Sequence, residues 1–207
     1  MVFLLLFATM TAPFAQATQT AYVQQDVEQL RDLMERASSR ADSLLVRYRL
    51  YPLTEDEAVL EEIPSSLSDG TAREYALLSG LWAYKAGEAS FFSAIQCGRR
   101  STNLLETAKA QAPEDPFVLL VEGQSLLVRP DIAGKDPATA AKRFARLAEI
   151  VDEHSVTGIS RTEAQVWQWV ALREADRTEQ ADALWTHLQN RDLPPLYQQF
   201  LEDPPEV

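Results

Sequence analysis

The sequence predicts an all-α protein, and three observations support this fold class. Apolar residues recur at steps of three and four positions through most of the chain, as they do on one face of a helix. No stretch alternates β-branched and polar residues between turn signals, as a half-buried strand would. Four pairs of residues also have the spacing of a capping box at a helix start: Asp26 with Gln29, Thr54 with Glu57, Thr71 with Glu74, and Ser160 with Glu163.

Residues 1–17 have the pattern of a signal peptide. An apolar run at 2–10 is followed by Pro13 and then by the triplet Ala-Gln-Ala at 15–17, which is the small-x-small pattern that signal peptidase accepts. The run is shorter than the roughly 20 residues that a membrane-spanning helix needs. We therefore expect cleavage after the triplet, export to the periplasm or beyond the cell, and no lasting membrane anchor. Residues 18–207 are expected to form a single helical domain.

The N-terminal part of this domain, residues 26–70, is predicted to begin with one long helix over 26–51. Its apolar residues lie on one stripe, and Pro52 is expected to end it because proline has no backbone N–H to donate. Thr54 then has the position of an N-cap for a further helix start.

Residues 71–195 are predicted to form three successive pairs of helices, because Gly and Pro residues separate the periodic stretches. The expected helices cover 71–86 and 88–111 in the first pair, 115–128 and 136–153 in the second, and 160–175 and 178–189 in the third. Each pair has apolar residues on more than one side, so that neighbouring pairs must stack to bury them. Residues 196–207 are expected to cap the stack, to form a tail, or to contact a second copy of the chain.

Composition and charge restrict the possible functions. The chain has 207 residues, of which 46% are hydrophobic and 24% charged, as in an ordinary globular domain. Its 31 acidic and 19 basic residues give a formal net charge of −12, which would repel nucleic acid and an anionic bilayer. One cysteine and two histidines leave few side chains for a metal site or a nucleophile. We expect no cofactor, no metal and no nucleic-acid partner.

The third helix pair resembles a tetratricopeptide repeat. Five of its residues occupy positions of that motif: Trp167, Val170 and Ala171 in the first helix, Ala183 in the second, and Pro195 as the closing proline. His187 and Asn190 depart from the motif's usual aromatic residue and alanine. In this motif small residues let two helices approach closely, and large residues fill the remaining space.

The first two pairs match the same motif at fewer positions. These positions are Gly80, Ser101, Leu105, Ala108 and Pro113 in the first pair, and Gly123, Ala140, Phe144 and Leu147 in the second. The successive small positions 80, 123 and 171 lie 43 and 48 residues apart, against a repeat length of about 34, which requires insertions between the repeats. An irregular helical bundle with similar alanine spacing is the alternative.

The resemblance implies a short right-handed solenoid in which the first helix of each pair lines a concave groove for a peptide or another protein. The positions carried over to this groove are Glu74, Leu77, Leu81, Tyr84, Lys85, Leu120, Gln124, Leu127, Gln165, Gln168 and Leu172. This lining is mostly apolar or amide in character. It favours an apolar or amphipathic ligand, or closure of the groove by the protein's own N-terminal helix.

Few side chains suggest chemistry. Cys97 lies on an apolar stripe and is expected to be buried, while His154 falls in a predicted connection and His187 near Trp185 is expected to pack. The acidic residues 55–57, 61 and 62 have the composition of a cation site, but a helix start explains the first three without a ligand, because the helix dipole favours carboxylates there. Gly98, Arg99 and Arg100 form a small basic island that can hold an anionic group of a partner or can equally balance the surrounding acidic residues.

Two tryptophans lie only two positions apart in the first helix of the third pair. Trp167 and Trp169 point about 200° from one another on a helix, so that burying both requires cover on two sides. We expect both in the core. The alternative is that one of them is exposed at the end of the stack and anchors a partner.

The functional expectation is a non-enzymatic, exported helical-repeat protein that mediates protein–protein contacts in the bacterial envelope. The first alternative is a periplasmic binding protein of similar build, which encloses a small apolar ligand for a membrane transporter. Its pocket would be lined by Leu81, Tyr84, Leu120 and Trp167. The second alternative is a hydrolase that uses His154 or Cys97.

Overall fold

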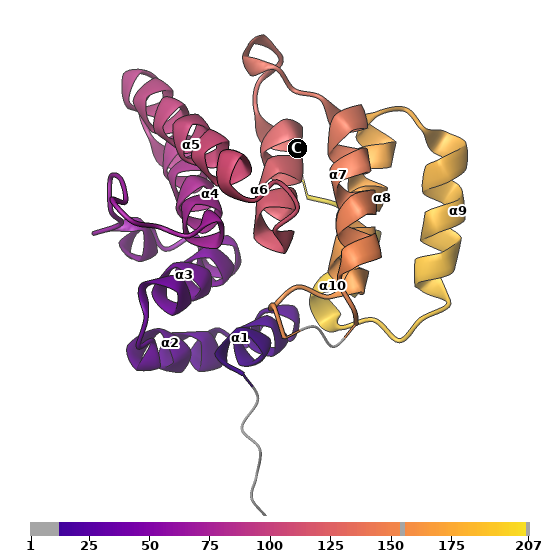
Figure 1. The fold of residues 1–207 in the computed structure, drawn as a ribbon. Coiled ribbons are helices and arrows are strands. Elements are labelled where there is room, and N and C mark those ends of the chain that lie inside the picture. Colours follow the sequence, from indigo (N-terminus) through magenta and orange to yellow (C-terminus); the bar gives the residue numbers. More distant parts are fainter. Residues whose placement is uncertain (1–12, 154–155, 206–207) are drawn as a thin grey trace, which may run out of the picture.

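The computed structural model describes residues 13–153 and 156–205, which fold into α-helices and two short 3-10 helices around a shared apolar core (Figure 1). The all-α prediction is confirmed for this part of the chain. The helices are α1 (Phe14–Val23), α2 (Val27–Arg36), α3 (Arg40–Thr54), η1 (Glu57–Leu60), α4 (Ala72–Glu88), α5 (Phe91–Gln111), α6 (Pro116–Val128), η2 (Asp131–Ala133), α7 (Pro137–Ile150), α8 (Arg161–Glu174), α9 (Thr178–Gln189) and α10 (Pro195–Glu202).

The N-terminal helices differ from the prediction of one long helix over 26–51, which is wrong. The structure has two helices there, because α2 ends at Arg36 and the extended backbone of Ala37 breaks the periodicity. The Ser39 hydroxyl then accepts a hydrogen bond from the N–H of Asp42 and starts α3. Serine competes for backbone hydrogen bonds in this way, so it favours a new start over helix continuation.

The end of α3 also differs from the prediction. Pro52 lies inside α3, which continues to Thr54 and ends at Glu55 in a left-handed conformation. Tyr51 is buried and stacks on Tyr84, which holds the last turn despite the N–H that proline lacks. Thr54 is consequently the last residue of a helix rather than an N-cap, and Asp56 caps the short η1 instead.

The six helices predicted between residues 71 and 189 are present, with ends within three residues of the expected ones. Thr71 and Glu74 form the predicted capping box at the start of α4. The Ser160 side chain accepts from the N–H of Glu163 at the start of α8. Local capping chemistry therefore located these helix starts correctly.

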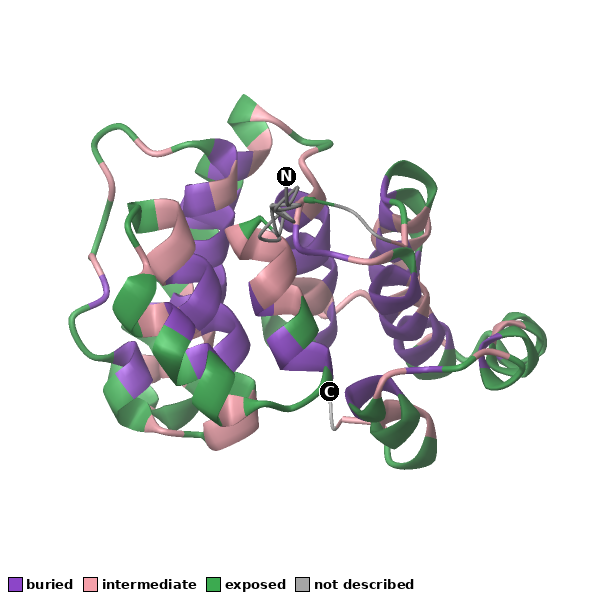
Figure 2. Ribbon diagram, turned by 90° about the horizontal axis from the view of Figure 1, so that it is seen from below, coloured by how far each residue is buried: buried purple, intermediate pink, exposed green. Residues whose placement is uncertain are grey.

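Consecutive helices contact one another along the chain. The most extensive contacts join α4 to α5, α7 to α8, and α6 to α7, while α3 and α6 both pack on α4. Figure 2 shows buried residues on the faces that the helices turn toward each other, whereas α9 lies at the edge and is mostly exposed. α10 packs on α1 and α8 and buries Leu196 and Tyr197.

Two glycines mark the closest approaches between helices. A Cβ atom on Gly80 would lie 2.5 Å from the ring of Tyr48 on α3, and one on Gly123 would lie 2.5 Å from the ring of Phe144 on α7. Both positions were predicted to be small for close approach. Ala183, predicted to play the same part in the third pair, is exposed on α9.

The predicted signal peptide lies partly outside the described residues, which begin at Pro13. The expected cleavage point after Ala17 falls within α1, whose following residue Thr18 is buried. Among the described residues, no helix is long and apolar enough to cross a membrane.

Candidate functional site

The predicted groove is filled by the protein itself. Its leucines at positions 77, 81, 120 and 127 are completely buried in the core, and Leu172 is almost so. Tyr48 and Tyr51 of α3 stack on Tyr84 of α4, and the Tyr48 hydroxyl donates to the Gln124 side chain on α6. Side chains of α3 therefore cover Tyr84 and Gln124.

Most of the polar groove residues also have partners within the chain. Glu74 accepts from the guanidinium of Arg40, and the Lys85 ammonium donates to the carbonyl of Leu60. The Gln165 side chain accepts from Arg191, and Gln168 remains half-buried. An open groove along the first helices of the three pairs is therefore absent from the described part of the chain.

The pocket expected by the ligand-carrier alternative is filled in the same way. Leu81 and Leu120 belong to the core, and Trp167 stacks on Phe144 and contacts Phe200 edge-on. Burial raises the pKa of Tyr84 well above its ordinary value. These side chains contact protein on the sides where a ligand would lie.

The structure describes two of the three side chains weighed for catalysis, Cys97 and His187. Cys97 is buried on α5, as expected, and His154 lies outside the described residues. His187 is exposed on α9, so the prediction that it packs is wrong. No group of three or more His, Cys, Asp or Glu side chains within the described ranges is arranged to hold a metal ion.

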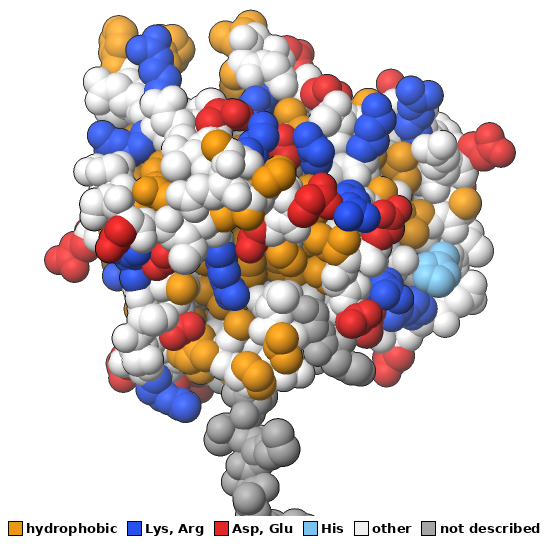
Figure 3. All heavy atoms as spheres, viewed as in Figure 1, with side chains coloured by type: hydrophobic (Ala, Val, Ile, Leu, Met, Phe, Trp, Pro, Cys, Tyr) orange, Lys and Arg blue, Asp and Glu red, His pale blue; other side chains and the backbone are white. Residues whose placement is uncertain are grey.

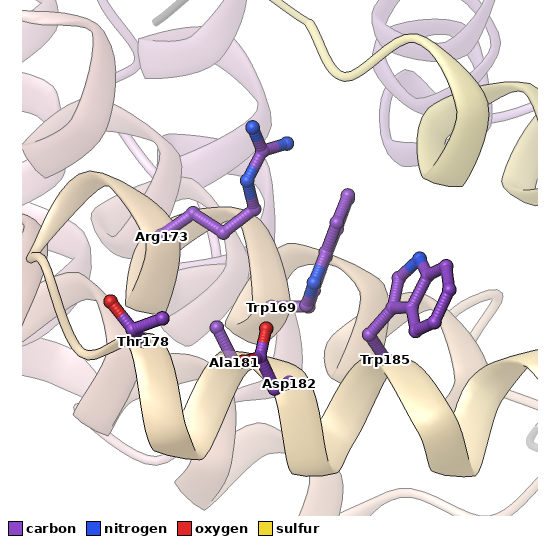
Figure 4. A pocket seen from close by; sticks show the side chains of 6 residues that line it. All are labelled: Trp169, Arg173, Thr178, Ala181, Asp182 and Trp185. Atoms are coloured by element: carbon purple, nitrogen blue, oxygen red, sulfur yellow. The ribbon is translucent and has the colours of Figure 1, made fainter.

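A pocket of about 340 Å³ lies between α8 and α9 (Figure 4). Its lining consists of Trp169 and Arg173 from α8, and of Thr178, Ala181, Asp182 and Trp185 from α9. Volumes near 300 Å³ are at the lower end of sites for small molecules or for single side chains of a partner.

Helical spacing explains how these residues meet. Trp169 and Arg173 are four positions apart on α8, and Asp182 and Trp185 are three apart on α9, so each pair shares one helix face. Ala181 is small and buried, which lets α9 approach α8 below the pocket. In Figure 4 both indole rings and the guanidinium rise from their helices on the same side.

The pocket side chains differ in their surroundings. Trp169 is 4% exposed and Trp185 38% exposed. The guanidinium carbon of Arg173 lies 4.9 Å from the centre of the Trp169 ring, in a cation–π contact that holds the Arg173 side chain in place. The pocket therefore has a buried aromatic floor under Arg173 and an exposed aromatic wall formed by Trp185.

The charged groups of this pocket are unpaired. Within the described part of the chain, the side chains of Arg173, Thr178 and Asp182 make no hydrogen bond or ion pair. A guanidinium fixed on an aromatic ring can donate two parallel hydrogen bonds to a carboxylate or bond a carbonyl oxygen. A carboxylate nearby can accept from an N–H or an ammonium. The pocket can thus bind polar groups beside an apolar one.

A buried ion pair fixes α8 relative to the N-terminal helices. Arg49 on α3 donates to both carboxylate oxygens of Glu163, at 2.5 and 2.9 Å, and to the carbonyl of Gly158 at 3.1 Å. Gln19 on α1 donates to Glu163 and to the Tyr197 hydroxyl on α10. Arg49 and Glu163 are enclosed by protein and position the helices, whereas Gln19 and Tyr197 also line a second pocket of about 200 Å³.

The neighbouring charge and the burial of Arg49 shift its pKa in opposite directions. Burial by itself lowers the pKa of Arg49, but the neighbouring Glu163 carboxylate reverses this effect and raises the pKa above its ordinary value. Burial also raises the pKa of Tyr22, whose ring lies under the Arg49 guanidinium, to about 12. Arg49 is therefore charged and Tyr22 neutral at physiological pH.

Sequence reasoning missed this pocket. It placed a possible exposed anchor at Trp167 or Trp169, which are both buried, whereas the exposed tryptophan is Trp185. The available signal was the repeat of Asp182 and Trp185 on one face of α9, adjacent to the buried stripe of Ala181 and Leu188. Comparisons with protein-family models, with curated proteins and with solved structures find no match to this chain.

Proposed function

We propose that this protein is a non-enzymatic, exported scaffold of the bacterial envelope, built from tetratricopeptide-like helix pairs, that binds a segment of another protein. The observation that carries the proposal is the pocket between α8 and α9, with its unpaired Arg173 and Asp182 beside the exposed ring of Trp185. Tryptophan and arginine are the residues most enriched at the energetic centres of protein interfaces.

The chemistry of the pocket suggests what kind of segment it takes. An apolar or aromatic side chain would cover the Trp185 ring, and a carboxylate or backbone carbonyl beside it would accept from Arg173. Asp182 would accept from a backbone N–H or from a basic side chain. A polypeptide offers these groups together, whereas a purely apolar small molecule would leave Arg173 and Asp182 without partners.

Site-specific photo-crosslinking in the native host tests this proposal. A photoreactive phenylalanine analogue at position 185 should form a discrete crosslinked species with another protein. The same analogue in place of Ala183, which is exposed on α9 outside the pocket, should not. Arg173→Glu should reduce the crosslink at position 185 because it reverses the charge beside Trp185.

Two results would count against the proposal. Equal crosslinking from positions 185 and 183 would show non-specific contact along α9. No crosslink from position 185, with normal amounts of folded protein, would remove the pocket as a protein-binding site.

A further inference from the structure

Two projecting tips of the molecule carry exposed apolar side chains. We define tip 1 as residues 88–95, which run from the end of α4 into the first turns of α5, and tip 2 as residues 128–134, which include η2. Phe91 and Phe92 in tip 1 are 74% and 79% exposed, and Ile132 in tip 2 is fully exposed. The remaining large apolar residues of the tips, Ile95 and Val128, are also exposed.

Both tips lie on the same edge of the molecule. Figure 1 shows the start of α5 and the η2 turn at the top of the fold, and Figure 3 shows apolar side chains at the ends of two separate projections there. Phe91 and Phe92 contact each other edge-on, with ring centres 5.5 Å apart, and make no other aromatic contact within the described residues. Exposure on this scale marks an interaction surface.

The charge of this edge is opposite to that of the whole protein. The segment 89–105 contains no acidic residue and two arginines, Arg99 and Arg100, in a chain whose net charge is −12. Arg129 lies within tip 2, and Lys135 directly follows it and pairs with Glu174. The acidic residues within the two tips are Glu88 and Asp131. The edge is therefore locally basic, although the whole chain would be repelled by an anionic surface.

The arginines lie behind the apolar tip rather than at its end. Arg99 and Arg100 follow Phe92 by about two helical turns on α5, and both are exposed. Arg100 rests on the ring of Trp82, at 4.4 Å from its centre. The apolar side chains thus lie at the end of the tip, and the cations lie further back toward the body of the protein. In a bilayer the acyl chains lie deeper than the headgroup phosphates. A tip that enters the bilayer would therefore place its apolar side chains near the acyl chains and its cations near the phosphates.

We propose that tips 1 and 2 dock this protein on the surface of a lipid bilayer that contains anionic lipids. The phenylalanines and Ile132 enter the boundary between headgroups and acyl chains, while Arg99 and Arg100 contact phosphates. Two separate projections can enter a fluid surface together, whereas a rigid protein partner would need two matching cavities at the same spacing. Repulsion of the acidic remainder turns this edge toward the bilayer.

Vesicle flotation of the full chain tests the proposal. We expect binding to phosphatidylcholine vesicles that contain phosphatidylglycerol, weaker binding without it, and release by salt. Phe91→Ser with Phe92→Ser should lower the partition coefficient by roughly tenfold or more. The matched control Val156→Ser removes an exposed apolar side chain outside the tips and should float like the parent.

The apolar run at 2–10 can itself bind lipid, so a second experiment must show that the tips contact the vesicles. A dye attached at a single site makes this distinction. In a Cys97→Ser background, an environment-sensitive dye on Ile132→Cys should shift its emission to the blue with these vesicles, while the same dye on Thr107→Cys should not. Thr107 is exposed on α5, about four turns from the tip. Flotation without a shift at position 132, or no flotation at all, would overturn the proposal.

Discussion

The guanidinium of Arg49 on α3 and the carboxylate of Glu163 on α8 form a two-bond ion pair in the interior, where their side chains are 1% and 0% exposed. The two residues are 114 positions apart in sequence. Neither could be buried alone at acceptable cost, because an unpaired charge loses its hydration without compensation. The pair therefore ties the orientation of the N-terminal helices to that of α8.

Removing one partner of this pair should destabilise the protein strongly. Glu163→Gln leaves the Arg49 charge buried without a counter-charge, and we expect a loss of about 3–5 kcal/mol in the free energy of unfolding. Arg146→Gln is a suitable control because its ion pair with Glu114 is exposed and should contribute less than about 1 kcal/mol. Urea unfolding of both variants measures the difference. Similar losses in the two variants would contradict the importance of burial.

Two glycine-to-alanine substitutions should change the stability of the protein in opposite directions, because only one of the glycines lies at a close contact between helices. Gly123→Ala places a methyl group 2.5 Å from the Phe144 ring and should cost about 1–3 kcal/mol. Gly98→Ala lies in α5 with no other atom within 4 Å of the added carbon, so it should stabilise the helix by roughly 0.5–1 kcal/mol. Thermal unfolding of the two variants tests the sign in each case. A stabilised Gly123→Ala would show that the interface between α6 and α7 is looser than described.

The stability contributed by Glu74 should depend on pH. Hydrogen bonds from Arg40 hold the pKa of Glu74 below its ordinary value, and the Thr71 backbone adds to this effect. Because the pKa is lower in the folded state, the contribution is complete above about 4.3, the value in an unfolded chain, and is lost as the pH falls through the folded value. The difference in stability between the parent and Glu74→Gln should therefore shrink on acidification.

Urea unfolding of the parent and Glu74→Gln at neutral and at acidic pH measures this difference. Arg40→Gln, which removes the main partner, should reproduce the loss at neutral pH and its decrease in acid. A difference that stays constant across this range would show that Glu74 contributes through packing rather than through its charge.

Substitution of the two pocket tryptophans should show which ring stabilises the fold and which is available to a partner. Trp169→Ala removes a buried ring and should cost about 3–5 kcal/mol. Trp185→Ala removes a ring that is 38% exposed and should cost clearly less, about 1–2 kcal/mol. Chemical unfolding of each variant gives these values. A large loss for Trp185→Ala would mean that this ring supports the fold rather than a partner.

The Cys97 thiol should be protected in the folded protein. It is buried on α5, so a thiol-specific reagent should modify it slowly in the native state and rapidly in urea. Thr107→Cys, exposed on the same helix, gives the rate for an accessible thiol. Equal rates at the two positions in the folded protein would place Cys97 at the surface and reopen its role as a nucleophile.

The starts of several helices could be predicted from the sequence because they depend on neighbouring residues. Thr71 with Glu74, and Ser160 before Glu163, cap their helices within one turn, without help from distant parts of the chain. The small positions Gly80 and Gly123 were predicted from their places in the tetratricopeptide-like pattern. Their actual neighbours, Tyr48 and Phe144, lie on helices that the sequence does not bring together by itself.

The errors arose where local signals competed with distant packing. Pro52 is a strong signal for a helix end, but the stacking of Tyr51 on Tyr84 keeps the last turn of α3 helical beyond it. The predicted groove residues were chosen by their register on single helices. Their accessibility depended on the helices packed against α4, which are α3, α5 and α6, and Leu77 and Leu81 are completely buried there.

The sequence by itself determined the all-α class, the capped helix starts and the burial of Cys97, because these follow from hydrophobic period and from contacts within a few residues. Only the tertiary structure decided that α3 packs on Tyr84 and Gln124, that Arg49 meets Glu163, and that Trp185 forms an open pocket with α8. The physical reason is that burial of a side chain depends on which helix lies beside it. That choice comes from packing the whole chain at once.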